Sequence, residues 1–271
     1  MELKATRFEV TDGVATVWLA RPHRRNAWTG RMHTEYRSIM ATLDADQAVR
    51  CVVVTGEGES FCVGADSEAL AKHAERGGYD PGTPLEVANP GYGVRPEWDH
   101  DFAWHFGLRL PVIARVNGAC AGIGLVLACY CDLRVAAGDA KLTTAAPQLG
   151  LPAEMGLSWL LPRLIGATNA ADLLLTGRIV RASDPVVAGL FNRVVTTDGL
   201  DEAVAFYARR FADDVSPVAV STAKRQLWGD LMDRDVGASV ERSKELTNEL
   251  MAGAQYREGV AALQEKRRPR F

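Results

Sequence analysis

Two apolar strands, each leading through a glycine turn into a helix, constrain the fold of this chain more than any other feature. Residues 51–54 lead to the small-residue segment 61–66, and residues 112–116 lead to the segment 117–124. Glycine lets the backbone turn sharply and approach another group closely. Asp66, at the end of the first segment, can cap a new helix. The first amides of a helix lack intrahelical acceptors, so they can bind an anion or an oxygen that is gaining negative charge. Either turn alone is also compatible with simple packing of a helix on a strand.

The flanking sequence continues this alternation of strands and helices. Residues 8–10 and 14–19 flank Thr11-Asp12-Gly13, which is a hairpin signal. Thr29 can cap a following helix. One face of that helix carries the apolar side chains Met32, Tyr36, Ile39, Met40 and Leu43. Because strands and helices alternate, we expect an α/β fold.

The pattern changes near residue 200. Ser216-Pro217 is a helix start, and residues 236–251 and 256–266 continue in a helical style. We therefore predict a core over residues 1–200 and a helical region over residues 201–271. Residues 73–105 are rich in glycine and proline and lack sustained periodicity, so they are predicted to form a functional lid or a mobile loop.

Charge and cysteine content exclude several classes of protein. The 31 basic and 34 acidic residues give a net charge of -3, which predicts neither a nucleic acid nor a membrane as partner. The five cysteines are odd in number and lie in apolar stretches, so they are interpreted as reduced core residues. No apolar run reaches the ~18 residues that span a bilayer, and no signal peptide is recognisable. We expect a cytoplasmic protein.

Most catalytic motifs are missing. The chain has no phosphate-binding loop, no H-E-x-x-H, no paired C-x-x-C and no G-x-S-x-G. His100 and His105 are five residues apart, which does not place them on one helical face. We therefore predict no metal site.

Four segments, residues 21–27, 61–66, 117–124 and 265–269, resemble the enoyl-CoA hydratase/isomerase (crotonase) superfamily in order and spacing. The resemblance covers nearly the whole chain. It implies an α/β crotonase-like spiral of β-β-α units followed by a C-terminal helical trimerisation region. It also implies a homotrimer or a hexamer built as a dimer of trimers. The substrate would be an acyl-CoA, with coenzyme A as part of the substrate and no separate cofactor.

By the same resemblance, the backbone N–H groups of Ala65 and Ile123 correspond to the two donors of an oxyanion hole for the thioester. The neighbouring residues are implied to contact coenzyme A or the acyl group. These are Arg24, Arg25, Ala27, Val63, Asp66 and Gly122. Arg24 and Arg25 are also compatible with an ordinary solvated turn.

The acid–base residues depart from the hydratase pattern. Val126 and Ala146 occupy the places of the two glutamates with which hydratases of this family activate water, and neither can transfer a proton. Glu154 resembles the single catalytic glutamate of 3,2-enoyl-CoA isomerases, and its apolar neighbours predict a raised pKa. The resemblance therefore favours a shift of a 3-enoyl double bond to the 2-position, with Glu154 as base. A glutamate there is also compatible with stabilisation of a helix start.

Three other functions remain open. A hydratase could combine Glu154 with a group from residues 73–105, which offer Glu86, Glu97, Asp99, His100, Asp101 and His105. A catalytically silent acyl-CoA-binding module would show affinity without turnover. A carbon–carbon hydrolase would need a base and a positioned water from the same segment.

Overall fold

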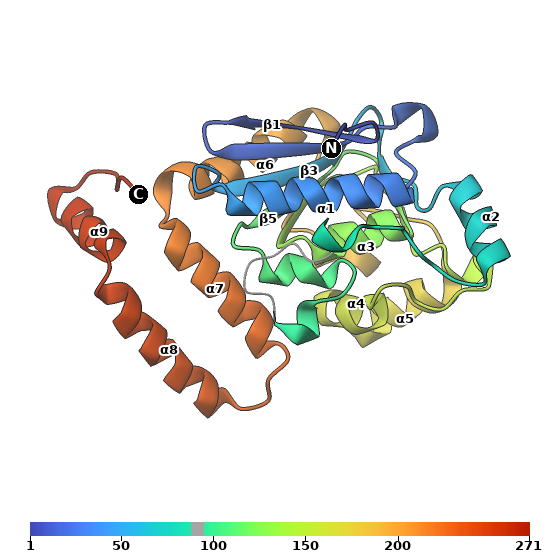
Figure 1. Ribbon diagram of the computed structural model, residues 1–271. Helices are drawn as coiled ribbons and strands as arrows, with labels where there is room; N and C mark the ends of the chain where they lie inside the picture. Colours follow the sequence, from blue (N-terminus) through green and yellow to red (C-terminus); the bar gives the residue numbers. More distant parts are fainter. Residues whose placement is uncertain (88–94) are drawn as a thin grey trace.

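The protein is described here by a computed structural model covering residues 1–87 and 95–271. In this part of the chain, a six-stranded sheet has the order β1-β2-β3-β5-β7-β10, and a four-stranded sheet has the order β4-β6-β8-β9. Figure 1 shows helix α6 on one side of the large sheet and α1 and α3 on the other. The expected α/β fold is confirmed.

The N-terminal hairpin forms where the sequence predicts it. Strand β1 (Thr6–Thr11) pairs antiparallel with β2 (Val14–Leu19). Asp12 and Gly13 both have positive φ, at 49° and 76°, as a two-residue turn that matches the strand twist requires. Strand β2 then pairs with β3 in parallel, so the hairpin forms the edge of the large sheet.

The core is built from a repeated unit of two strands and a following segment. The first strands, β3 (Cys51–Gly56), β5 (Val112–Val116) and β7 (Leu133–Ala137), are parallel neighbours in the large sheet. The second strands, β4 (Ser60–Cys62), β6 (Ala119–Ala121) and β8 (Lys141–Thr143), are parallel neighbours in the small sheet. Stacking of these units brings corresponding turns of successive units side by side.

Helices cover both faces of the large sheet. Helix α1 (Gly30–Ala45) begins at Thr29, whose hydroxyl accepts from the Met32 amide at 3.1 Å, as predicted. Its buried face joins the main core, together with α3 (Ile123–Tyr130). On the opposite face, α6 (Leu200–Arg209) packs a separate cluster of apolar residues against β3, β5 and β7.

The remaining elements of the core complete the two layers. They are α2 (Ser67–Arg76), α4 (Leu157–Ile165), α5 (Ala167–Thr176), β9 (Val180–Arg181), β10 (Arg193–Val195) and the single-turn helices η1 (Pro22–Arg24), η5 (Pro147–Leu149), η6 (Pro185–Val187) and η7 (Thr197–Gly199). The cysteines are all buried and free of disulfides, in agreement with their interpretation as core residues.

The C-terminal helices form an arm. After the π-helical turn η8 (Arg210–Asp214) come α7 (Pro217–Asp230), α8 (Val236–Met251) and α9 (Ala254–Glu265). Figure 1 shows α7 running along the side of the core and α8 and α9 lying apart from it. Helix α7 is attached through Lys224, whose ammonium donates to the Leu110 carbonyl at 2.8 Å and lies 2.7 Å from Asp132. Since α6 packs on the sheet, the arm itself starts with α7. The division of the chain at residue 200 remains a prediction.

The expectation of a structureless segment over residues 73–105 is wrong for its described C-terminal part. Short helices η3 (Pro96–Trp98) and η4 (Ala103–Gly107) form there, and Phe102, Trp104 and His105 are fully buried. The aromatic side chains of this segment fill the core at irregular spacing. Because they follow neither a helical nor a strand period, no sequence signal indicated that the segment is ordered. Helix η2 (Leu85–Val87) is exposed, and residues 88–94 lie outside the described part.

No helix among the described residues is both long and apolar enough to span a membrane.

Candidate functional site

The two glycine turns predicted from the sequence are in contact. A Cβ added to Gly122 would lie 3.6 Å from the Cα of Gly64, and one added to Gly64 would lie 3.3 Å from the Ala121 carbonyl oxygen. Gly64 has φ +100°, and Gly122 has φ 48° and ψ -122°. Both conformations are open to glycine and strained for other residues. The residues that follow these glycines, Ala65 and Ile123, are therefore brought to one place.

The amides of Ala65 and Ile123 are free to bind a ligand. Trp28 pairs with Ala65 as an isolated parallel bridge, in which the Trp28 amide donates to Gly64 and the Asp66 amide donates to Trp28. The intervening Ala65 amide is not used in this bridge. Ile123 is the first residue of α3, so its amide has no intrahelical acceptor. Within the described residues, neither amide donates to a backbone carbonyl.

Close packing fixes the second turn. A Cβ on Gly124 would clash with the Cys62 carbonyl oxygen and side chain, so α3 can lie this close to β4 only with glycine there. The Gly122 amide donates to the Thr143 carbonyl at 3.1 Å, which ties the turn to β8. Donors held rigidly in this way do not have to reorganise when charge develops on a bound oxygen.

Asp66 has a structural role at the first turn. Its Oδ1 accepts from the Glu68 amide at 3.0 Å and caps α2, as predicted, while Oδ2 lies 3.0 Å from the Arg21 guanidinium. Burial alone would raise the pKa of Asp66, but the Glu68 amide and Arg21 outweigh it and lower the pKa. A carboxylate held charged in this way is a poor proton acceptor.

The residues implied to contact coenzyme A lie along this turn. Asn26 is buried and donates through Nδ2 to the Ser60 carbonyl at 2.8 Å, which holds the loop beside β4. Arg24 and Arg25 are exposed, and Arg24 lies 3.4 Å from Asp66. The other predicted members of this group, Ala27 and Val63, are buried and half-buried. The structure thus brings the predicted coenzyme A residues together beside the first glycine turn.

Glu154 reaches the junction of the two turns. Its Oε2 lies 3.7 Å from the point where a Cβ on Gly122 would stand. Two residues with positive φ follow it, Met155 at 46° and Gly156 at 74°, and the Tyr130 hydroxyl donates to the Met155 carbonyl at 2.9 Å. Among the described residues its carboxylate has no hydrogen bond or ion pair. Burial raises the pKa of Glu154, as the sequence predicted.

Val126 and Ala146 offer no proton-transfer group. Val126 lies one turn into α3, and Ala146 precedes η5. Both are buried and apolar. In the described part of the chain, no group of three or more histidine, cysteine or acidic residues could hold a metal ion.

A cluster of titratable groups near Glu154 was not predicted. The Tyr79 hydroxyl lies 3.4 Å from His33 Nδ1, and Asp101 lies 3.5 Å from His33 Nε2 and 3.3 Å from Arg37. Burial is the main cause that raises the pKa of Tyr79, and the charge of Glu154 adds to it. Burial likewise lowers the pKa of His33 to about 4, against the opposing charge of Asp101. No local sequence signal connects these residues.

His105, one of the loop candidates, is a core residue. Its Nδ1 lies 2.7 Å from the Phe102 carbonyl oxygen and must donate to it, so Nε2, 2.8 Å from the Tyr36 hydroxyl, accepts. Burial lowers the pKa of His105 to about 3. A neutral imidazole with both nitrogens bound is unsuited to be the base of this site.

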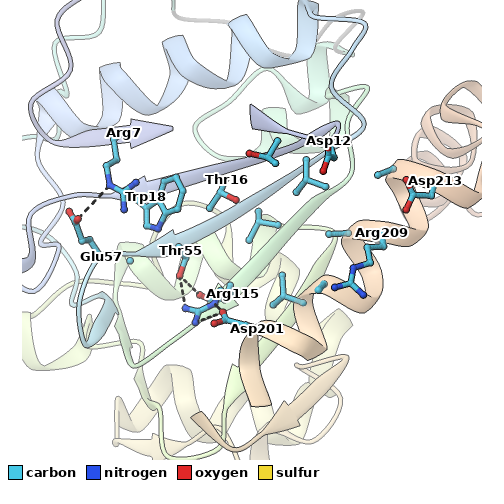
Figure 2. Close-up of a pocket in the computed structure, with 18 of the residues that line it drawn as sticks. Arg7, Asp12, Thr16, Trp18, Thr55, Glu57, Arg115, Asp201, Arg209 and Asp213 are labelled. Atoms are coloured by element: carbon cyan, nitrogen blue, oxygen red, sulfur yellow. Dashed lines mark hydrogen bonds and ion pairs between the residues drawn. The ribbon is translucent and has the colours of Figure 1, made fainter. Parts of the chain in front are cut away.

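Two of the cavities at the core differ in what lines them. One of about 520 Å³ is lined in part by Met155 and Gly156, the two residues that follow Glu154 in the chain. A larger cavity of about 1040 Å³, shown in Figure 2, lies between the large sheet and α6. Four of its charged groups form ion pairs, Arg115 with Asp201 at 2.7 Å and Arg7 with Glu57 at 3.4 Å. The larger cavity is lined neither by a predicted site residue nor by a chain neighbour of one, whereas the smaller cavity contains the two residues that follow Glu154.

The stacked β-β-α units and the paired free amides beside a carboxylate define a crotonase-like acyl-thioester enzyme. Residues 9–271 match the sequence model of the enoyl-CoA hydratase/isomerase family, and the chain belongs to that family. Its members act on acyl-CoA thioesters.

Individual relatives carry different names. The chain is 35% identical over 265 residues to a probable enoyl-CoA hydratase of Mycobacterium tuberculosis, covering 95% of this chain and 89% of the relative. It is 30% identical over 262 residues to the 1,2-epoxyphenylacetyl-CoA isomerase of Escherichia coli, covering 97% and 96%. The crystal structure of a putative enoyl-CoA hydratase from Streptomyces coelicolor has a TM-score of 0.85 at 34% identity, covering 100% and 94%.

Proposed function

We propose that the enzyme shifts the double bond of a 3-enoyl-CoA to the 2-position, with Glu154 as the only acid–base residue. The observation that carries this proposal is the position of the Glu154 carboxylate at the junction of the glycine turns. Hydration needs groups that hold and activate water, whereas Val126 and Ala146 are apolar and buried. An allylic proton transfer needs one base only.

The proposed reaction proceeds through a thioester dienolate. The Glu154 carboxylate takes a proton from C2, and the electron pair of that C–H bond moves onto the thioester oxygen through the new C1–C2 double bond. The amides of Ala65 and Ile123 donate to this oxygen. The π pair of the C3–C4 double bond then takes the proton back from Glu154 at C4. The π pair between C1 and C2 becomes the C2–C3 double bond, and the electron pair on oxygen restores the thioester carbonyl. The base contributes ~10²–10⁴ in rate, and each donor on the order of 3 kcal/mol.

The coenzyme A moiety is proposed to bind at the first glycine turn. Arg24 and Arg25 would meet its phosphates, since both side chains are exposed there. Ala27, Val63, Asp66 and Gly122 would form the adjoining wall. The reaction as proposed needs no metal and no cofactor besides the coenzyme A of the substrate.

A second candidate is a hydratase that uses Glu154 with another group. Tyr79 and Asp101 favour it, because Tyr79 interacts electrostatically with Glu154 and both belong to the His33 cluster. The hydratase names of several relatives point the same way. An acyl-CoA-binding module without activity is distinguished from both by the absence of turnover.

Glu154→Gln tests the proposal, because it preserves shape but removes the basic oxygen. We expect isomerisation to fall by ~10² or more while acyl-CoA affinity is retained. Isomerisation of a 3-enoyl-CoA and hydration of a 2-enoyl-CoA are measured with the same acyl chain, and affinity by calorimetry in metal-free buffer. The Arg24→Ala/Arg25→Ala double variant should show the opposite pattern, with affinity lost.

Two controls complete this experiment. Glu202→Gln changes an exposed glutamate on α6, away from the predicted site residues, and should leave both rates unchanged. Asp101→Asn tests the hydratase alternative. If hydration is the faster reaction in the unmodified enzyme and persists in Glu154→Gln, the base lies elsewhere and the isomerase proposal is wrong.

A further inference from the structure

The cavity of about 520 Å³ that includes Met155 and Gly156 has walls made largely of aromatic and thioether side chains. Its floor is formed by the buried aromatic residues Trp98, Phe106 and Tyr130. The half-buried Trp159 and the thioether side chains of Met155 and Met232 also line it. These residues come from η3, η4, the end of α3, the start of α4 and the segment after α7, so the pocket exists only in the folded chain.

Contacts among these side chains keep the floor in place. The ring centroids of Phe106 and Tyr130 are 5.2 Å apart, and Phe106 stacks on Trp228 of α7 at 4.0 Å. The Tyr130 hydroxyl is occupied by the Met155 carbonyl. The Trp98 indole N–H donates to the Met232 sulfur at 3.0 Å. Both polar atoms of the floor therefore have partners, and the rings are left as apolar walls.

Polar groups limit the pocket elsewhere. Glu97 and His100 are exposed and Asp101 is half-buried, and all three line the cavity. A long alkyl chain that extended past the floor would have to cover these groups and remove their water, which is unfavourable. A cavity of about 150 Å³ can hold benzene, so a pocket of about 520 Å³ accommodates a ring together with its linker.

We propose that this pocket selects an acyl group that carries an aromatic ring over a linear acyl group of equal carbon number. The inference rests on the proposed function, which places the thioester beside Glu154. It adds that the acyl group extends past Met155 and Gly156 into this pocket. Ring–ring and sulfur–ring contacts add to simple burial of apolar area. A linear chain gains only from burial.

Binding and turnover are measured separately to test this. Calorimetry compares a saturated acyl-CoA with a terminal phenyl group and its linear counterpart, neither of which can isomerise. We expect the phenyl compound to bind about tenfold more tightly, which is about 1.4 kcal/mol. The corresponding 3-enoyl-CoA pair is then compared in kcat/KM. Tighter phenyl binding without isomerisation would overturn the proposed reaction and keep the pocket assignment, whereas isomerisation with equal or better linear binding would overturn the pocket assignment.

Variants locate the preference in this cavity. Trp159→Leu should reduce the preference for phenyl severalfold. Ala103→Leu fills the pocket from η4 and should weaken phenyl binding about tenfold or more, with free coenzyme A binding unchanged. Ala171→Leu, on the exposed face of α5, is the matched control and should bind like the unmodified protein. Retention of the preference in both pocket variants would show that the ring binds elsewhere and would overturn the inference.

Discussion

Glu35 and Glu154 are both withdrawn from solvent, but their surroundings shift their pKa values in opposite directions. Burial raises the pKa of each. Glu35 also accepts from the amides of Lys4, Ala5 and Thr6 at 2.8–2.9 Å, and these bonds lower its pKa overall. Glu154 has no such donors among the described residues. Glu35 is thus a charged structural anchor for the first strand, whereas Glu154 is disposed to exchange a proton.

This difference predicts the pH dependence of the reaction. The base must be ionised, so kcat/KM should rise with pH as Glu154 loses its proton. Because the pKa of Glu154 is raised, this acid limb should lie above ~4.3, the usual value for glutamate. The measurement is kcat/KM for a 3-enoyl-CoA between about pH 4 and 8, with folding checked at each pH. A limb at or below the usual value would count against Glu154 as the base.

His33 provides the control for this profile, because its pKa of about 4 lies near the same range. A variant His33→Asn removes that titration and keeps a polar side chain. If Glu154 determines the acid limb, the midpoint of the limb should stay above ~4.3 in His33→Asn. Loss of the His33 contact to Tyr79 should shift this midpoint only slightly.

At the scale of elements, local sequence signals located the glycine turns well. The hairpin, the Thr29 cap, the Asp66 cap and both turns depend on residues close in sequence, and all appear as predicted. The cluster of Tyr79, His33 and Asp101 joins residues far apart in the chain, so no local sequence pattern could predict their contact. The buried aromatic residues Trp98, Phe102, Trp104 and Phe106 were not predicted for a related reason, because their irregular spacing has no helical or strand period.

The conformation of Gly122 predicts a sharp cost for a side chain there. At φ 48° and ψ -122°, alanine would be strained, at a cost of about 1–3 kcal/mol. Relief of that strain would move the adjacent Ile123 amide from its place in the proposed oxyanion hole. We expect Gly122→Ala to lower kcat by ~10²–10³, the effect of removing one donor. Steady-state kinetics with a 3-enoyl-CoA measures this.

Gly166 is the matched position for that variant. It also has a positive φ, at 79°, but a Cβ there would meet nothing within 4 Å. Gly166→Ala should therefore lose stability by a similar mechanism while kcat is kept. If kcat fell equally in the two variants, the loss would reflect backbone strain in general. The proposal that the Ile123 amide is an oxyanion-hole donor would then be wrong.

At the scale of the whole molecule, the arm leaves a large apolar surface uncovered. A groove of about 850 Å³ between α7, α8 and α9 is lined by residues such as Val218, Leu250 and Tyr256. Val236 and Leu263 are 80% and 79% exposed. The chain end returns towards the core, where Arg50 donates to the Phe271 carbonyl at 3.0 Å, but this contact does not cover the groove. Extended apolar surface of this kind marks an interface between proteins.

We therefore propose that the protein is a homotrimer or a hexamer of two trimers, held together by the arm. Closed symmetric assembly would cover every copy of the groove at once. Sedimentation at micromolar concentration should give the mass of three or six chains. Leu263→Glu should shift it towards smaller species, because a charge would be buried in the interface. Leu175→Glu, at a position 78% exposed on α5, should leave the mass unchanged. A monomer in the unmodified protein would refute the assembly, since the arm would then carry its apolar surface in water.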